Sequence, residues 1–183
     1  MNAYPIHTVD TAPAPSRDQL QQIQATLGQI PSLAAGMAES PTLLRSFFTV
    51  REIYAQGTLS QLDIQVLSLV NAMENDCDWC VAFHSALALK NGLQEDALAA
   101  IRDDRPTGIQ RLDGLTALTR GLIRTRGNIS AEVLEAFLSA GFTRAQALEV
   151  VLGIGFSVMA NFAGHLIQPP LDAGLEKFAW ART

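Results

Sequence analysis

Apolar residues recur along this chain of 183 residues at intervals of three and four positions, the spacing of one face of an α-helix. No segment sustains the alternation of apolar and polar residues that is typical of a half-buried β-strand. Prolines, glycines and capping residues divide the pattern into short segments. We therefore expect an all-α fold of nine or ten helices, at 17–29, 32–39, 41–56, 59–73, 77–90, 94–101, 110–125, 130–140, 144–168 and 171–180.

The first 16 residues do not follow this helical pattern. Pro5, Pro13 and Pro15 lie among small residues, which is typical of an arm or coil. Ser16 is a suitable N-cap for the first helix, because its hydroxyl can accept a hydrogen bond from a free backbone N–H group. We expect an N-terminal arm over 1–16 and a single helical domain over 17–183.

The most apolar stretch of the chain covers 145–166. It carries Gln146, Glu149, Asn161 and His165, so its uninterrupted apolar run is too short for a membrane span. We expect a helix buried in the bundle or at a subunit interface, and no membrane partner. Asn161 and His165 lie four residues apart on it. His165 either lines the same pocket as Cys80 or bonds a nearby carbonyl group, and the sequence leaves both open.

Composition narrows the class of protein. Hydrophobic residues make up 48% of the chain and charged residues 17%, which indicates a globular protein. The net charge is −5 and no basic run is present, so we expect no nucleic-acid partner. The N-terminus lacks a basic start followed by an apolar core, so we expect no signal peptide.

Candidate chemistry is concentrated in the segment 75–85. It holds both cysteines of the chain, Cys77 and Cys80, together with His84. On a helix these residues are i,i+3 and i,i+4 neighbours, so the three side chains share one face. Asp76 can cap a helix that starts at Cys77. A CxxC pair in a chain without a secretion signal predicts a working redox pair in a reducing, cytoplasmic compartment.

Two features of this segment can activate a thiol, which attacks only as the thiolate. The N-terminus of a helix stabilises an anion and favours Cys77, whereas an adjacent base favours Cys80, one turn before His84. Together the two thiols suit attack on an oxidant or disulfide, followed by resolution of the product. Two other interpretations are a pair of inert buried thiols and half of a zinc site completed by His165 or an acid. Trp79 and Phe83 are expected to pack and to exclude water.

The pattern CxxCxxxH at a helix start, in an all-α chain of this size, resembles the AhpD-like alkylhydroperoxidases of the carboxymuconolactone decarboxylase superfamily. The similarity runs from about Phe47 to the C-terminus and includes Leu59-Ser60 before the motif. It implies an AhpD-like multi-helix bundle. It also implies that Cys80 attacks the peroxide, that Cys77 is the resolving thiol, and that His84 belongs to a proton relay.

One position departs from the family. The family has a glutamate twelve residues before the first cysteine, where this chain has Gln65. Glutamine can orient a water molecule or His84 by hydrogen bonds, but it cannot take a proton. The departure predicts a low peroxidase rate. Glu74 could substitute as the base; the alternative is a solvated acid at a helix junction.

The resemblance also implies partners. These are a hydroperoxide substrate, an external dithiol reductant of the lipoyl or thioredoxin type, no haem, flavin or metal cofactor, and assembly into a homo-oligomer, commonly a trimer or hexamer. Two competing hypotheses remain. One is a carboxymuconolactone decarboxylase-type enzyme that acts on a small cyclic acid with His84 or His165 as the base. The other is a non-catalytic helical oligomer whose thiols sense redox state or bind zinc.

Overall fold

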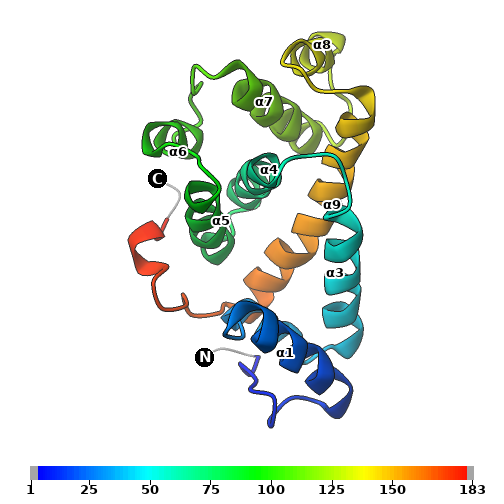
Figure 1. Cartoon of the computed structure of the whole chain (residues 1–183), viewed down its shortest axis with the longest axis vertical. Helices are drawn as coiled ribbons and strands as arrows, with labels where there is room; N and C mark the ends of the chain where they lie inside the picture. The colour runs from blue at the N-terminus through cyan, green and yellow to red at the C-terminus, as the bar shows by residue number, and fades with distance from the viewer. Residues whose placement is uncertain (1–3, 181–183) are drawn as a thin grey trace.

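The computed structural model describes residues 4–180 and confirms the all-α prediction over that range (Figure 1). There the chain forms nine α-helices and one 3-10 helix, without a strand. The elements are α1 (Ala14–Leu27), α2 (Ser32–Met37), α3 (Pro41–Tyr54), α4 (Gln61–Glu74), α5 (Asp78–Lys90), α6 (Glu95–Arg102), α7 (Gln110–Arg124), α8 (Ala131–Ser139), α9 (Arg144–Ile167) and η1 (Glu176–Phe178).

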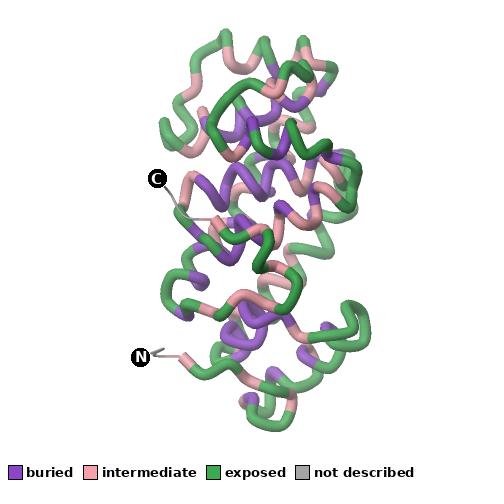
Figure 2. Tube along the Cα trace, turned by 90° about the vertical axis from the view of Figure 1, so that its left-hand side faces the viewer, coloured by how far each residue is buried: buried purple, intermediate pink, exposed green. Residues whose placement is uncertain are grey.

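Helix α4 lies at the centre of the molecule, with α5 on one side and α9 on the other (Figure 1). Its most extensive contacts are with α5, α7 and α9. Every residue from 66 to 73 is buried, so α4 packs on more than one side. Figure 2 shows the buried positions on the inward turns of the helices and the exposed positions along loops and outer turns.

Two capping boxes fix the starts of the helices that frame the site. Ser60 accepts from the Asp63 backbone N–H, and the Asp63 carboxylate accepts from the Ser60 N–H at the start of α4. Thr143 and Gln146 make the reciprocal pair at the start of α9. Each box satisfies two N–H groups that the helix leaves free.

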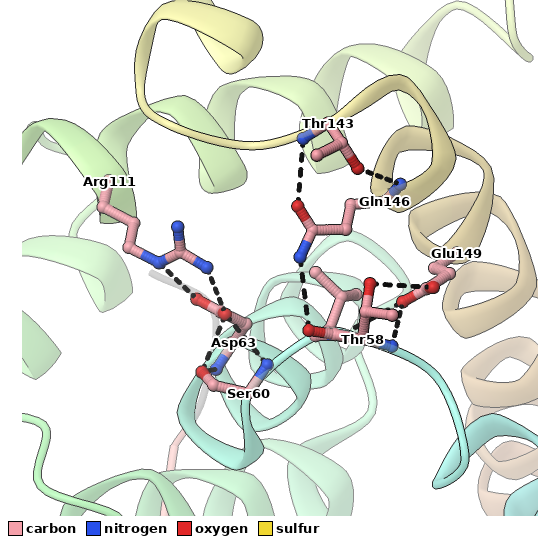
Figure 3. A network of polar contacts seen from close by, with 8 residues as sticks. Thr58, Ser60, Asp63, Arg111, Thr143, Gln146 and Glu149 are labelled. Atoms are coloured by element: carbon pink, nitrogen blue, oxygen red, sulfur yellow. Dashed lines mark hydrogen bonds and ion pairs between the residues drawn. The ribbon is translucent and has the colours of Figure 1, made fainter.

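A network of polar contacts joins the start of α4 to α7 and α9 (Figure 3). The carboxylate of Glu149 accepts hydrogen bonds from the Thr58 N–H, the Thr58 hydroxyl and the Leu59 N–H. Arg111 of α7 donates to the buried carboxylate of Asp63, with Nη2 at 2.7 Å. The buried carboxylate of Asp63 is thus paired with a cation and hydrogen-bonded. These contacts position the start of α4 against α7 and α9.

The first helix begins earlier than the sequence indicated. Helix α1 starts at Ala14 with Pro13 as the N-cap residue, and not after Ser16. Pro15 fits inside the first turn, where its missing N–H group would have no helical partner. Ser16 is buried, and its hydroxyl donates to the Ala38 carbonyl oxygen at 2.7 Å instead of capping the helix.

The predicted helix over 171–180 is wrong. This segment is irregular apart from the 3-10 turn η1, and Gly174 has a φ of 89°. Its polar groups bond to other elements: Asp172 accepts from the backbone N–H and hydroxyl of Ser32, and Arg102 donates to the carbonyls of Phe178 and Ala179. These long-range contacts outweigh the helical spacing of its apolar residues.

Helix α9 is long and apolar enough to cross a membrane, judged by length and composition alone. One of its faces packs against α2, α3 and α4, and 44% of its most apolar window is buried. The opposite face is an exposed apolar stripe, which comprises Leu148, Val151, Leu152, Phe162 and Leu166. The helix is therefore a core helix on one side and unpartnered within the described part of the chain on the other.

Candidate active site

The two cysteines lie at the tight connection between α4 and α5. Helix α4 ends at Glu74, and the chain passes through Asp76 in the left-handed region, with a φ of 54°. Aspartate tolerates this region better than most residues. Cys77 is then the N-cap of α5, not its first helical residue, and Asp76 is not the cap. The Cys77 backbone N–H donates to the Ala72 carbonyl oxygen at 2.9 Å, which closes the turn.

Cys77 and Cys80 form a disulfide across the first turn of α5, with their Cα atoms 5.3 Å apart. This separation is within the usual range for disulfides. The thiols are thus close enough to pass between a dithiol and a disulfide, as their spacing predicted. Both cysteines are buried, with exposed fractions of 3% and 1%.

Gly164 of α9 covers the disulfide. A Cβ atom at this position would lie 2.9 Å from Cys77 Sγ and 3.9 Å from Cys80 Sγ. Only glycine lets the backbone of α9 approach the sulfur atoms so closely. Sequence reasoning missed Gly164, because a glycine in an apolar helix does not reveal which element approaches it.

A pocket of about 350 Å³ opens beside the disulfide on the Cys77 side. Cys77 is among its lining residues and Cys80 is not. Its volume is within the range of small-molecule sites. The lining consists of the start of α5 and the end of α9, through Asp76, Cys77, Asp78, Trp79, Gly164, His165, Gln168 and Pro169.

His84 follows Cys80 by one helical turn and contacts Gln65 of α4. His84 Nδ1 lies 2.9 Å from Gln65 Oε1. Since a carbonyl oxygen only accepts, Nδ1 carries the proton and Nε2 is left as the basic nitrogen of the ring. Burial lowers the pKa of His84 to about 4, so the imidazole is neutral at pH 7. Gln65 therefore orients His84, which the sequence named as one of its possible roles.

Glu74 has a different environment from either one expected. Its carboxylate accepts two hydrogen bonds from Arg124, at 2.8 and 2.7 Å, and Arg120 Nε lies 3.6 Å away. Only 9% of the side chain is exposed, so Glu74 is not a solvated acid. Two arginines thus face the carboxylate and compensate its charge.

His165 and Asn161 hold the connection between α4 and α5 in place. His165 Nε2 donates to the Asn75 carbonyl oxygen, and the side chain lines the pocket beside Cys77. His165 therefore bonds a nearby carbonyl group, and the pocket that it lines is beside Cys77 and does not include Cys80. Asn161 is buried, and its Oδ1 accepts from Asn75 Nδ2 at 3.2 Å. Since Asn75 is the C-cap of α4, this pair positions the turn that presents Cys77.

Two aromatic side chains connect the pocket with His84. Trp79 lines the pocket and stacks on Phe83, with ring centroids 5.0 Å apart. The edge of Phe83 in turn packs against His84, at 5.3 Å between centroids. Phe83 thus places apolar material against the imidazole of His84, in agreement with its lowered pKa. Trp79 and Phe83 thus pack as expected.

A zinc site was one interpretation of the cysteines. Among residues 4–180, no group of three or more His, Cys, Asp or Glu side chains is placed to hold a metal ion. The donors near the disulfide are divided instead between the pocket, the Asn75 turn and the pair of Gln65 with His84.

Comparison with known proteins agrees with this geometry. Residues 41–108 match the carboxymuconolactone decarboxylase family. A search of curated proteins finds no significant match. Among solved structures, a peroxidase-related protein with an alkylhydroperoxidase AhpD core, from Ralstonia eutropha JMP134, has a TM-score of 0.78 at 18% identity, over 94% of this chain and 93% of that one.

Two further structures have the same fold. A peroxidase-related protein from Silicibacter sp. TM1040 has a TM-score of 0.75 at 18% identity, over 93% of this chain and 91% of that one. A cysteine-to-alanine variant of the debrominase Bmp8, in complex with 2,3,4-tribromopyrrole, has a TM-score of 0.77 at 12% identity, over 97% and 95%. At these identities the structural similarity establishes the fold.

The fold is that of the AhpD-like structures. The segment that matches the carboxymuconolactone decarboxylase family, residues 41–108, contains both cysteines and His84.

Proposed function

We propose that the protein is a thiol-dependent peroxidase that reduces hydroperoxides through the pair of Cys77 and Cys80. The observation that carries this proposal is the disulfide across the first turn of α5, with the hydrogen-bonded pair of His84 and Gln65 one turn beyond it. A dithiol that closes within one helical turn is suited to two-electron chemistry. A decarboxylase needs no such pair.

The reaction has two chemical steps. The Cys80 thiolate attacks the outer oxygen of the hydroperoxide, the O–O bond breaks, and the alkoxide leaves with a proton as an alcohol. Cys80 is now a sulfenic acid. The Cys77 thiol attacks this sulfur, water leaves, and the disulfide forms. An external dithiol of the lipoyl or thioredoxin type then returns two electrons and two protons.

His84 is the proton carrier of the first step. With Nδ1 bonded to Gln65, its Nε2 can accept the Cys80 proton and later deliver it to the alkoxide. The neutral Gln65 cannot balance the charge of an imidazolium, and burial opposes that charge as well. We therefore expect a slow peroxidase.

The exposed stripe on α9 supports assembly. Leu148, Val151, Leu152, Phe162 and Leu166 form an apolar surface along one side of a 24-residue helix. Such a surface is typical of protein interfaces. We propose a homo-oligomer, a trimer or hexamer, that buries this stripe; sedimentation equilibrium of the wild type and of Leu166→Glu would test it, with a monomeric wild type as the opposing result.

The peroxidase role is tested by counting thiols. Reduced protein is mixed with one equivalent of cumene hydroperoxide, and free thiols are titrated over time. We expect the loss of two thiols per chain, and a loss of at least about a hundredfold in rate for Cys80→Ser. Survival of both thiols in the wild type, or an unchanged rate in Cys80→Ser, would overturn the proposal.

A second candidate is the reductive removal of a halogen, favoured by the debrominase neighbour and by the pocket beside Cys77. Two thiols supply the two electrons that convert a carbon–bromine bond to a carbon–hydrogen bond, with bromide as the leaving group and a disulfide as the oxidised product. Reduced protein incubated with 2,3,4-tribromopyrrole should release one bromide per pair of thiols lost. Absence of bromide would eliminate this candidate.

A further inference from the structure

The two cysteines of the disulfide differ in their surroundings. Both are almost completely buried, 3% and 1% exposed, but Cys77 lines the 350 Å³ pocket and Cys80 does not. A thiolate that cleaves a disulfide must reach the sulfur it attacks, and the other sulfur becomes the leaving group. The pocket therefore offers an approach to one of the two sulfurs.

We propose that the pocket is the thiol-exchange site of the oxidised protein, that an external thiol attacks Cys77 there, and that Asp78 selects reductants without negative charge. The inference rests on the proposed function only in that the protein is recycled by a thiol reductant. It assigns the attacked sulfur and the charge class of the reductant, which the family resemblance does not.

The charge of the pocket lining supports the selection. Asp78 is an exposed carboxylate at its wall, and none of the lining residues within 4–180 is a lysine or arginine. A reductant that carries a carboxylate into the pocket would be repelled by the carboxylate of Asp78, and salt would weaken this repulsion. Uncharged or cationic thiols do not meet this barrier.

His165 adds a proton acceptor to the same wall. Its Nε2 donates to the Asn75 carbonyl oxygen, so in the neutral ring Nδ1 is free of hydrogen. His165 also lines the pocket beside Cys77. A thiol that enters the pocket can pass its proton to this nitrogen and attack as the thiolate.

The exchange balances in atoms and electrons. The reductant thiolate bonds to Cys77 Sγ, the Cys77–Cys80 bond breaks, and Cys80 leaves as a thiolate next to His84. The second thiol of the reductant then attacks the reductant's first sulfur and releases Cys77. The reductant ends as a disulfide, and its two protons end on Cys77 and Cys80. The leaving sulfur is thus the one that meets the next peroxide.

The attacked sulfur can be located directly. Oxidised wild-type protein is treated with excess 2-mercaptoethanol, quenched in acid, blocked with N-ethylmaleimide, and the peptide that contains both cysteines is sequenced by mass spectrometry. We expect the mercaptoethanol adduct on Cys77 and the maleimide on Cys80. The reverse pattern, or an equal division between the two sulfurs, would overturn the proposal.

The charge selection is tested with two thiols of similar size and opposite charge. Rates per thiolate are compared for cysteamine and mercaptoacetate, and we expect cysteamine to be about three- to tenfold faster. Asp78→Asn should reduce this ratio. The matched control Asp96→Asn, also an exposed aspartate in the first turn of a helix, should leave it unchanged. A ratio near one in the wild type, or one that Asp78→Asn does not change, would refute the selection.

A further variant tests His165. His165→Gln keeps a side-chain donor for the Asn75 carbonyl oxygen but loses the acceptor nitrogen. We expect slower exchange at pH 7 with the adduct still on Cys77; an unchanged rate would exclude His165 as the acceptor. None of these measurements uses a peroxide. If hydroperoxide leaves the reduced thiols intact while the adduct forms on Cys77, the peroxidase proposal fails and the exchange site stands.

Discussion

The surroundings of Cys77 and Cys80 differ, although the two residues share one helical turn. Cys77 borders a pocket with two carboxylates and the exposed His165. Cys80 is followed by the neutral His84, which is held by an uncharged amide and packed against Phe83. The comparison shows how one dithiol can have one cysteine beside a polar pocket and the other beside a neutral, buried imidazole. We expect the negative charge of the pocket beside Cys77 to select the reductant. A positive charge on His84, next to Cys80, would lower the stability of the fold.

The largest expected effect concerns the charge of His84. Its pKa is lowered to about 4, so the folded protein binds fewer protons than the unfolded chain between pH 6.5 and 4. The neutral His84 therefore makes a contribution to the free energy of unfolding that is fully present above pH 6.5. It is lost as the pH falls toward 4, and the total loss is about 3 kcal/mol at most. Urea unfolding at pH 7.5 and 4 should show the loss in the wild type.

His84→Gln is the control for this titration, because it removes the ionising group and keeps a polar side chain. As the pH is lowered, the free energy of unfolding should fall more in the wild type than in His84→Gln. A difference that stays constant with pH would mean that His84 can be charged inside the folded protein.

The second prediction changes the Cys80 side alone. Gln65→Glu places a carboxylate next to His84, which raises the pKa of the imidazole and stabilises the imidazolium that forms when Cys80 loses its proton. We expect the oxidation of Cys80 by hydroperoxide to become about tenfold faster. Stopped-flow measurement of thiol loss would detect this change.

Thiol exchange at Cys77 serves as the internal control for Gln65→Glu and should be unchanged. Gln65→Leu, which removes the hydrogen bond to His84, should be slower than wild type. If Glu and Leu at this position give the same peroxidase rate, then Gln65 has no part in the relay.

The third prediction concerns the cover over the disulfide. Gly164→Ala gains up to about 1 kcal/mol of helix propensity but brings a Cβ to 2.9 Å from Cys77 Sγ, an overlap of a kind that costs about 1–3 kcal/mol. We expect a net loss of about 1 kcal/mol in the oxidised protein, measured by urea unfolding.

Gly155→Ala is the matched control in the same helix. A Cβ at that exposed position meets nothing within 4 Å, so helix propensity should stabilise the variant by about 0.5–1 kcal/mol. If Gly164→Ala and Gly155→Ala stabilise the protein equally, then α9 can move away from the disulfide without a loss of stability.

The smallest expected effect on the reaction comes from Glu74. Its carboxylate is engaged with Arg124 and Arg120, so Glu74→Gln should leave the peroxidase rate within about twofold. The loss of the partly exposed ion pairs should cost about 1 kcal/mol. A rate that falls tenfold or more in the thiol titration would place Glu74 in the relay after all.

Local features of the fold were predictable where a short segment contains both partners. The capping pairs of Ser60 with Asp63 and of Thr143 with Gln146 lie three residues apart, so the helix starts could be inferred from the sequence. The segment 171–180 has no such pair. Its structure depends on Ser32 and Arg102, which no local pattern associates with it.

The candidate site shows the same limit. The i,i+3 spacing of Cys77 and Cys80 predicted a pair that can close, and the family position of Gln65 indicated that it could orient His84. Gly164 above the sulfurs could not be inferred, because the contact joins distant parts of the chain. The pocket beside Cys77 depends on the same packing of α9 on α5.

Helix α9 presents two surfaces that meet at its C-terminal end. Gly164 touches the disulfide and His165 borders the pocket, while the next residue, Leu166, belongs to the exposed apolar stripe. In the homo-oligomer proposed above, any coupling between ligation at one surface and association at the other would pass through a single turn of helix, and such linkage is reciprocal. Whatever opening of the disulfide did to the dissociation constant of the oligomer, covering the stripe would do by the same factor to the redox equilibrium of Cys77. The concentration of the protein would then be a variable of its own redox chemistry.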